Sequence, residues 1–198
     1  PEGEYNPAGE SHMNYTGTIS VPEPVFEDVL EATARSLKVH GYKNILFLGE
    51  SGDSQASQER VAARLQQLWA GQDMRVASIS DYYYGNGQVD HLVARGYSQE
   101  QIGTHAGIRD TSELMYIAGD HVRLDNTYFA GRRKVGLNGD YTQASKSLGA
   151  DMIALKIDAG VAQIKSILAS EPAELLDQGV IAKKRQSPID TTTTAGFE

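Results

Sequence analysis

The chain has no cysteine among its 198 residues. Disulfide bonds, thiolate metal ligands and cysteine nucleophiles are therefore excluded for these residues. No apolar run approaches the roughly 20 residues that a membrane-spanning helix needs, so we expect no membrane partner. Targeting patterns are also missing, and together with the lack of cysteine this favours a cytoplasmic protein.

Basic residues are fewer than acidic ones, 18 against 26, which gives a formal net charge of −8. The two short basic clusters, at 132–134 and 183–185, are too small to predict a nucleic-acid partner. What remains is an ordinary globular composition, 40% hydrophobic and 22% charged. That length and composition are enough for one domain with one core.

The segment from residue 26 to residue 79 alternates between helical and strand patterns. Apolar residues recur at helical spacing over 26–37 and again over 54–69, while β-prone apolar runs occupy 44–48 and 74–79. This alternation predicts the α/β class, with a parallel sheet and helices packed on its faces. Further along, the pattern indicates short helical segments at 89–94 and 98–103, a helix at 111–118 and a long helix at 153–168.

The first candidate site is the turn Gly49-Glu50-Ser51-Gly52-Asp53, which follows the first predicted strand. In open α/β sheets, ligands bind outside the carboxyl ends of the strands. The two carboxylates of this turn can bind a divalent metal or exchange protons. A structural interpretation also stays open, in which Asp53 or Ser54 caps the next helix and Glu50 is a solvated turn residue.

The second candidate site is the segment from His105 to Glu113. His105 lies five residues before Asp110, with a glycine between them to fold the chain back, and a histidine near a carboxylate is typical of proton transfer. The alternative is that Asp110 and Glu113 form a capping box and His105 is a loop residue. The run Tyr82-Tyr83-Tyr84, after the second predicted strand, either lines a pocket or packs in an oligomer interface.

Three segments together resemble the creatininase (creatinine amidohydrolase) family. The first, YTGTISVPEPVFEDVLEATARSLKVHGYKNILFLGESGDSQ, has its GTIS-type strand, helix, HG(F/Y) and apolar strand before a glycine-rich turn. The second, HAGIRDTSELM, is similar to the family's HAG-x-x-E-T-S signature. The third, LNGDYTQASKSLGADMIALKIDAGVAQI, is similar to its closing segment, an acidic-glycine turn before a long helix. The segments follow the family's order over residues 15–168.

The resemblance implies a three-layer α/β/α sandwich with a mostly parallel sheet, assembled as a homo-oligomer that is often a hexamer. It also implies hydrolysis of a C–N bond in a small cyclic amide, with a divalent metal pair, manganese or zinc, as the cofactor. The metal activates water, and the histidine of the HAG motif moves the proton. The expected partner is thus a small-molecule substrate.

Carried over residue by residue, the resemblance makes His105 the proton-transferring group and Asp110 a metal ligand. The first turn has Ser51 in place of the family's metal-binding histidine, and Glu50 beside it is expected to serve as metal ligand and catalytic group. A site with only oxygen ligands favours magnesium, calcium or manganese over zinc. Substrate binding is expected from Ser51, Gly52, Asp53 and Tyr83.

The family's first metal-binding segment, E-x-H…D, has no match in residues 1–17. Either the sequence begins after that segment, or the segment is absent in this protein. We expect 1–17 to be an N-terminal loop, 18–170 to be the creatininase-like domain and 171–198 to be an extension or tail. Two other functions stay open. One is a family member that has lost the metal site and acts as a small-ligand-binding or structural subunit, and the other is a hydrolase of lactones or sugar derivatives.

Overall fold

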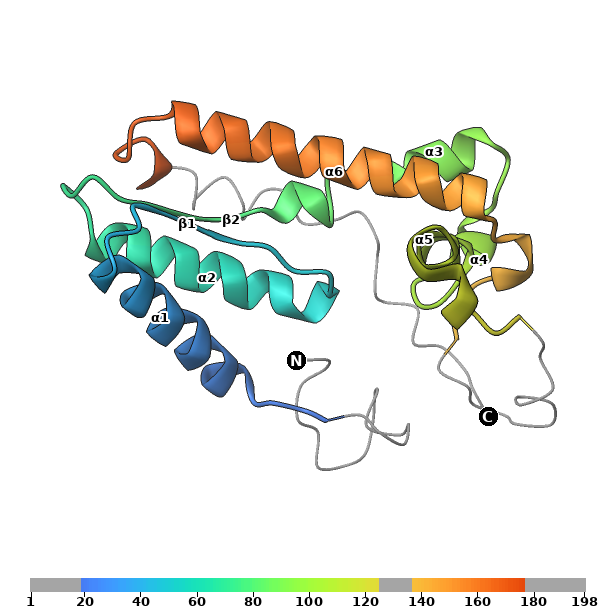
Figure 1. Ribbon diagram of the computed structural model, residues 1–198, viewed down its shortest axis with the longest axis horizontal. Helices are drawn as coiled ribbons and strands as arrows, with labels where there is room; N and C mark the ends of the chain where they lie inside the picture. The colour runs from blue at the N-terminus through green and yellow to red at the C-terminus, as the bar shows by residue number, and fades with distance from the viewer. Residues whose placement is uncertain (1–18, 125–136, 177–198) are drawn as a thin grey trace.

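The structure is a computed structural model that describes residues 19–124 and 137–176. Figure 1 shows the order of the elements along the chain. The described strands are β1 (Asn44–Phe47) and β2 (Arg75–Ser78). The α-helices are α1 (Glu23–Val39), α2 (Gly52–Leu68), α3 (Gln88–Ala94), α4 (Gln99–Ile102), α5 (Ile108–Ala118) and α6 (Lys146–Ala169). Short 3-10 helices are η2 (Ser80–Tyr82), η3 (Gly119–His121) and η5 (Tyr141–Gln143).

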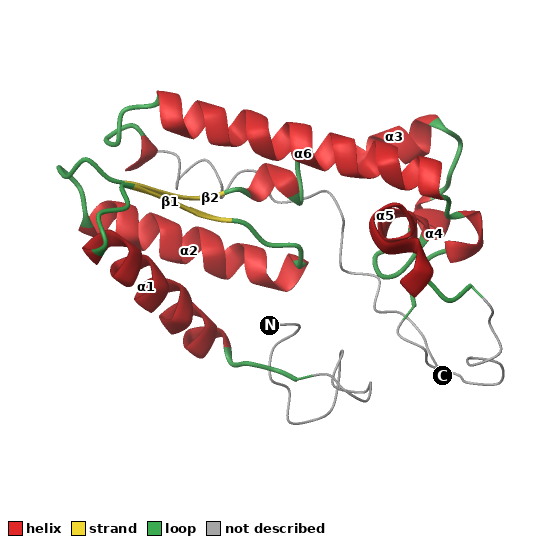
Figure 2. Ribbon diagram, viewed as in Figure 1, coloured by secondary structure: helices red, strands yellow, loops and turns green. Residues whose placement is uncertain are grey.

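The two strands pair in parallel, with Asn44 opposite Arg75 and Phe47 opposite Ser78. A parallel pair needs a crossover connection, and α2 provides it. Helices α1 and α2 cover one face of the strands, and the C-terminal half of α6 lies over the other (Figures 1 and 2). The core between α1, α2 and the strands is formed by Ala34, Ile45, Phe47, Val61, Ala62, Leu65, Trp69, Met74 and Val76.

Helix α6 joins two apolar clusters along its length. Its C-terminal half packs Ile167 with Ile79 and Leu175 beside the strands. Its N-terminal half packs against α3, α4 and α5 through Leu92, Ile102, Ile108, Leu148 and Met152. The long helix therefore holds the strand region and the α3–α5 region in one arrangement, as Figure 1 shows.

The prediction of an α/β chain with parallel strands and intervening helices is confirmed for residues 26–79. In the part of the chain that the structure describes, the sheet has two strands, with helices on both faces. Helix α6 begins at Lys146, before the first apolar residue that predicted it. None of the helices in 19–124 and 137–176 is long and apolar enough to cross a membrane. The predictions for 1–17 and for most of 171–198 lie outside the described residues.

Candidate functional site

The turn between β1 and α2 is held by buried polar side chains of α2. A Cβ on Gly49 would lie 2.1 Å from Gln58 Nε2, so only glycine leaves room for that side chain. The Gln55 amide donates to the carbonyl oxygens of Gly49, at 2.9 Å, and Ser51, at 3.0 Å. Ser51 is the residue before the helix, so the alternative that Asp53 or Ser54 caps α2 is wrong. The Ser54 hydroxyl instead donates to the Ser51 carbonyl.

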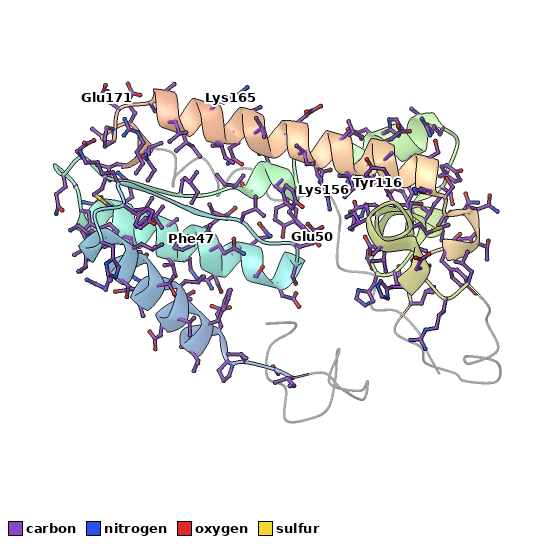
Figure 3. All side chains as sticks on the ribbon, in the orientation of Figure 1. Phe47, Glu50, Tyr116, Lys156, Lys165 and Glu171 are labelled. Atoms are coloured by element: carbon purple, nitrogen blue, oxygen red, sulfur yellow. The ribbon has the colours of Figure 1, made fainter. Side chains whose placement is uncertain are left out.

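Glu50 in this turn contacts a buried lysine of α6. Lys156 Nζ lies 2.5 Å from Glu50 Oε1 and 2.7 Å from Glu113 Oε2 of α5, and the Lys156 side chain is only 3% exposed. Figure 3 shows Glu50 and Lys156 close together beneath α6, at the carboxyl end of the strands. The other Glu113 oxygen accepts from Gln88 Nε2 of α3 at 2.6 Å. We call Glu50, Gln88, Glu113 and Lys156 the lysine cluster.

Electrostatics within the lysine cluster keep the ammonium charged. Burial alone lowers the pKa of Lys156, but the hydrogen bonds and charges of Glu113 and Glu50 outweigh it and raise the pKa. The ammonium also lies 5.2 Å from the centre of the Tyr82 ring, a cation–π distance. Burial, followed by the Glu50 carboxylate, raises the pKa of Tyr82, so its phenol stays protonated.

The tyrosines after β2 lie against the start of α2. A Cβ on Gly52 would be 3.2 Å from the Tyr83 hydroxyl oxygen, so the phenol reaches the turn directly. The rings of Tyr83 and Tyr84 meet edge to face, with 5.0 Å between their centres. Tyr83 therefore contacts the Glu50 turn, while pocket lining and an oligomer interface both stay predictions for the tyrosine run.

A hollow of about 600 Å³ opens beside the turn, between α1, β1 and the first turns of α2. Its walls are partly apolar and partly polar, and its lining includes Glu50 and Ser51 together with Phe26, Leu30 and Gln58. Gln58 is 4% exposed, and its Oε1 is buried without a hydrogen-bond partner among the described residues. Because that oxygen is itself buried, the exposed Glu50 carboxylate is the hydrogen-bond acceptor that a ligand in the hollow can reach.

The HAG segment forms a second, separately braced turn. His105 and Asn138 exchange two backbone hydrogen bonds, of 3.2 and 2.8 Å. Ala106 has a φ of 52°, a left-handed conformation that is unusual for alanine. Asp110 Oδ2 accepts from the Ala106 N–H at 2.9 Å, and the Thr111 hydroxyl donates to the Ala106 carbonyl at 3.0 Å.

Asp110 also accepts from Arg109 Nε at 3.0 Å. Burial works against the Arg109 charge, but Asp110 and, less strongly, Tyr83 and Glu113 raise its pKa. The capping-box alternative is wrong, because α5 begins after Gly107 and Glu113 points instead to the lysine cluster. Asp110 is thus a brace of the turn that holds His105.

The chain is similar to known proteins in sequence and in fold. The profile of the creatininase family, described as creatinine amidohydrolase, matches residues 5–164. The chain belongs to the creatininase family. A solved mutant creatininase is 18% identical, with a TM-score of 0.61 over 80% of this chain and 69% of that one. A mutant creatininase complexed with creatine is 17% identical, with a TM-score of 0.59 over 80% and 70%.

A third similar structure is a creatininase with manganese in its description, 18% identical with a TM-score of 0.58 over 78% of this chain and 68% of that one. At these identities the structures support the creatininase-like fold alone. Among curated proteins, none matches the chain.

The potential metal ligands among the described residues do not fit a resident metal of the creatininase type. Within 19–124 and 137–176, no three His, Asp or Glu side chains are grouped so that they could hold a metal ion. The two ligands expected from the sequence, Glu50 and Asp110, contact the cations Lys156 and Arg109. A carboxylate that is already paired with a buried cation is a weak ligand for a second cation.

The structure brings some expected site residues together and adds others. Glu50, Ser51 and Gly52 lie in one turn with Tyr83 against it, and Asp53 is exposed in the first turn of α2. His105 and Asp110 form the separate HAG turn. Sequence reasoning missed Gln88 and Lys156, and it named Glu113 only as the end of the second candidate site and as part of a capping box. The available signal was Lys156 itself, a charged residue one position from Ile157 within a strongly apolar helix pattern.

Proposed function

We propose that this chain is a small-molecule-binding member of the creatininase family that works without a resident metal at the Glu50 turn. The ligand lies in the hollow beside β1, against Glu50 and Ser51. The observation that supports this function best is the pairing of Glu50 with the buried Lys156. An internal ammonium there already neutralises the carboxylate that a metal would need.

The chemistry of the hollow suggests the kind of ligand. Phe26 and Leu30 offer an apolar wall, while the Glu50 side chain is 58% exposed. Its carboxylate accepts hydrogen bonds. A small molecule with N–H donors and a compact apolar part therefore fits, and small amides and amidine-like compounds belong to this class.

Hydrolysis of a C–N bond in a small cyclic amide is the second candidate function. It is favoured by the bracing of the HAG turn, where Asp110 and Thr111 fix Ala106 in a left-handed conformation beside His105. A histidine held in this way is suited to proton transfer. In this candidate His105 and Glu50 are the catalytic groups, and a divalent metal, manganese or zinc, would need ligands beyond the described ones.

Several further expectations from the family resemblance also stay proposals. They are a three-layer α/β/α sandwich with a mostly parallel sheet, a creatininase-like domain over 18–170, a homo-oligomer such as a hexamer, and a cytoplasmic location. A lactone or a sugar derivative as the substrate is an alternative that the same substrate panel tests.

The experiment uses the full chain freed of metal with a chelator. Creatinine, creatine and γ-butyrolactone are titrated by calorimetry, and turnover of each is measured with and without manganese or zinc. We expect saturable binding of at least one nitrogen compound without metal, and loss of that binding in Ser51→Trp, which fills the hollow. The control is Ala63→Trp, an exposed position on α2, the helix that follows Ser51.

Three results would change this conclusion. Metal-dependent turnover that disappears in His105→Ala would make hydrolysis the function, and γ-butyrolactone turnover would make the lactone the substrate. Absence of binding and of turnover for all three compounds would remove the hollow as a site for small molecules of this class.

A further inference from the structure

We propose that Lys156 acts as a built-in cation, and that its ammonium group occupies a position where the two carboxylates of Glu50 and Glu113 would otherwise bind a divalent metal. This inference rests on the proposed function, because it explains how the Glu50 turn keeps its shape without a resident ion. It assigns a role to a side chain that the HAG and Glu50 motifs do not include.

The geometry around the ammonium resembles that of a small oxygen-ligand cation site. Glu50 comes from the turn after β1 and Glu113 from α5, so two elements that are far apart in sequence each direct one carboxylate oxygen at Nζ, at 2.5 and 2.7 Å. Calcium–oxygen distances in proteins are about 2.3–2.6 Å, only slightly shorter. A metal ion at the Nζ position would thus have two charged oxygen ligands without a rearrangement of the backbone.

The surroundings also hold the second carboxylate in place. Gln88 is 1% exposed, and its amide nitrogen donates to Glu113 Oε1 at 2.6 Å and to the Met152 carbonyl at 2.8 Å. The Tyr82 ring lies over the ammonium on another side. Because Glu113 is oriented by Gln88 rather than by Lys156 alone, its carboxylate stays directed at this position when the lysine is shortened.

The charge balance explains why the lysine excludes a metal. Two carboxylates and one ammonium leave a single negative charge, whereas the same pair without the lysine leaves two. A divalent ion placed near the ammonium would be repelled by it, and the repulsion is strong because the Lys156 side chain is almost completely buried. The sequence has therefore replaced an external cofactor with a covalently attached cation.

The test is a gain of metal binding. In Lys156→Ala, manganese binding is measured from the electron paramagnetic resonance signal of free manganese, with the full chain as the comparison. We expect stoichiometric binding at least about tenfold tighter than in the unaltered chain, since one repelling charge is removed. Lys165→Ala is the matched control, because Lys165 is an exposed lysine of the same helix (Figure 3). Lys165→Ala should bind manganese no more tightly than the unaltered chain.

The double variant Lys156→Ala with Glu113→Gln tests whether the tighter manganese binding depends on the Glu113 carboxylate. This variant should bind manganese no more tightly than the unaltered chain. If Lys156→Ala folds only when manganese is present, the metal has replaced the lysine and the inference stands. A folded Lys156→Ala that binds manganese no better than the unaltered chain would overturn it.

A measurement on the unaltered chain keeps the inference testable even if the variant never folds. Manganese that binds the unaltered chain tightly and is lost in Glu50→Gln would mean that Lys156 does not exclude the metal, and the inference would fail. Ligand titration separates the two proposals. A gain of manganese binding in Lys156→Ala without any ligand binding by the unaltered chain would remove the proposed function alone.

Discussion

Lys156 is the residue that most distinguishes the site found here from the one expected from the sequence. Its ammonium contacts Glu50, which lies 106 positions earlier in the chain, and Glu113, which lies 43 positions earlier. Such contacts depend on tertiary packing, so spacing along the sequence could predict the turn but not the partner of its carboxylate. The same holds for Asp110, whose role as a brace depends on the left-handed turn at Ala106.

At this scale, the buried amide of Gln88 gives a direct prediction. Gln88→Leu removes the donors to Glu113 and to the Met152 carbonyl while it keeps a similar volume. Because two buried acceptors lose a partner, we expect the free energy of unfolding to fall by about 2 kcal/mol. Urea unfolding measures the change. Gln67→Leu, at an exposed position of α2, is the control, and an equal effect of both substitutions would show that Gln88 is not a structural anchor.

Among the elements, helices and strands with clear apolar periodicity were predicted well, because their signal is local. Helix α1 begins at Glu23 with Pro24 in its first turn, and β1 covers 44–47 of the predicted strand. Helix α5 begins at Ile108, three residues before the predicted start at 111. The partners of Asp110 and Glu113 are in the HAG turn and in α6, which local patterns do not reveal.

Helices α1 and α2 are joined by an ion-pair ladder at their exposed edge. Glu23 and Glu27 contact Arg60, while Glu27 and Glu31 contact Arg64. The acidic residues lie four apart on one helix and the basic residues four apart on the other, so one face of each helix is used. Because these pairs are partly exposed, each contributes about 1 kcal/mol or less.

Glu31 makes the ladder sensitive to acid. Hydrogen bonds from Arg35 and then Arg64 lower its pKa below the usual 4.5. An acid whose folded pKa is lowered adds stability that is present above the unfolded value and is lost as the pH falls through the folded one. We therefore expect Glu31→Gln to be less stable than the unaltered chain at neutral pH, with the difference shrinking below pH 4.5.

Thermal unfolding from neutral to acidic pH measures this difference. The control is Asp28→Asn, an exposed carboxylate of the same helix. A difference for Glu31→Gln that stays constant on acidification would mean that the ion pairs with Arg35 and Arg64 do not stabilise the folded chain.

The crossing of α5 and α6 depends on Gly149. A Cβ there would lie 1.9 Å from the Ser112 carbonyl oxygen and 2.9 Å from Tyr116 Cβ, so the helices touch through the glycine. Gly149→Ala forces them apart, and we expect a loss of about 3 kcal/mol in a denaturant titration. Gly160→Ala on the same helix is the control, because its nearest neighbour is the Tyr82 side chain at 3.3 Å. Equal losses would contradict a glycine-dependent crossing.

For the whole molecule, family membership and the creatininase-like fold could be predicted from three segments that occur in the family's order. The family resemblance also led to expectations about a metal pair that the described donors do not support, because the fold fixes where a site lies and not which side chains fill it. The central proposal is that Lys156 neutralises the Glu50 turn of this chain internally.

The most direct measurement of that claim is elemental analysis of the full purified chain, before and after dialysis against manganese and against zinc. We predict that no stoichiometric metal is retained in either case, because Glu50 and Asp110 are paired with Lys156 and Arg109. Stoichiometric manganese or zinc that survives dialysis and is lost in Glu50→Gln would contradict the account, and would place the chain among the metal-dependent members of its family.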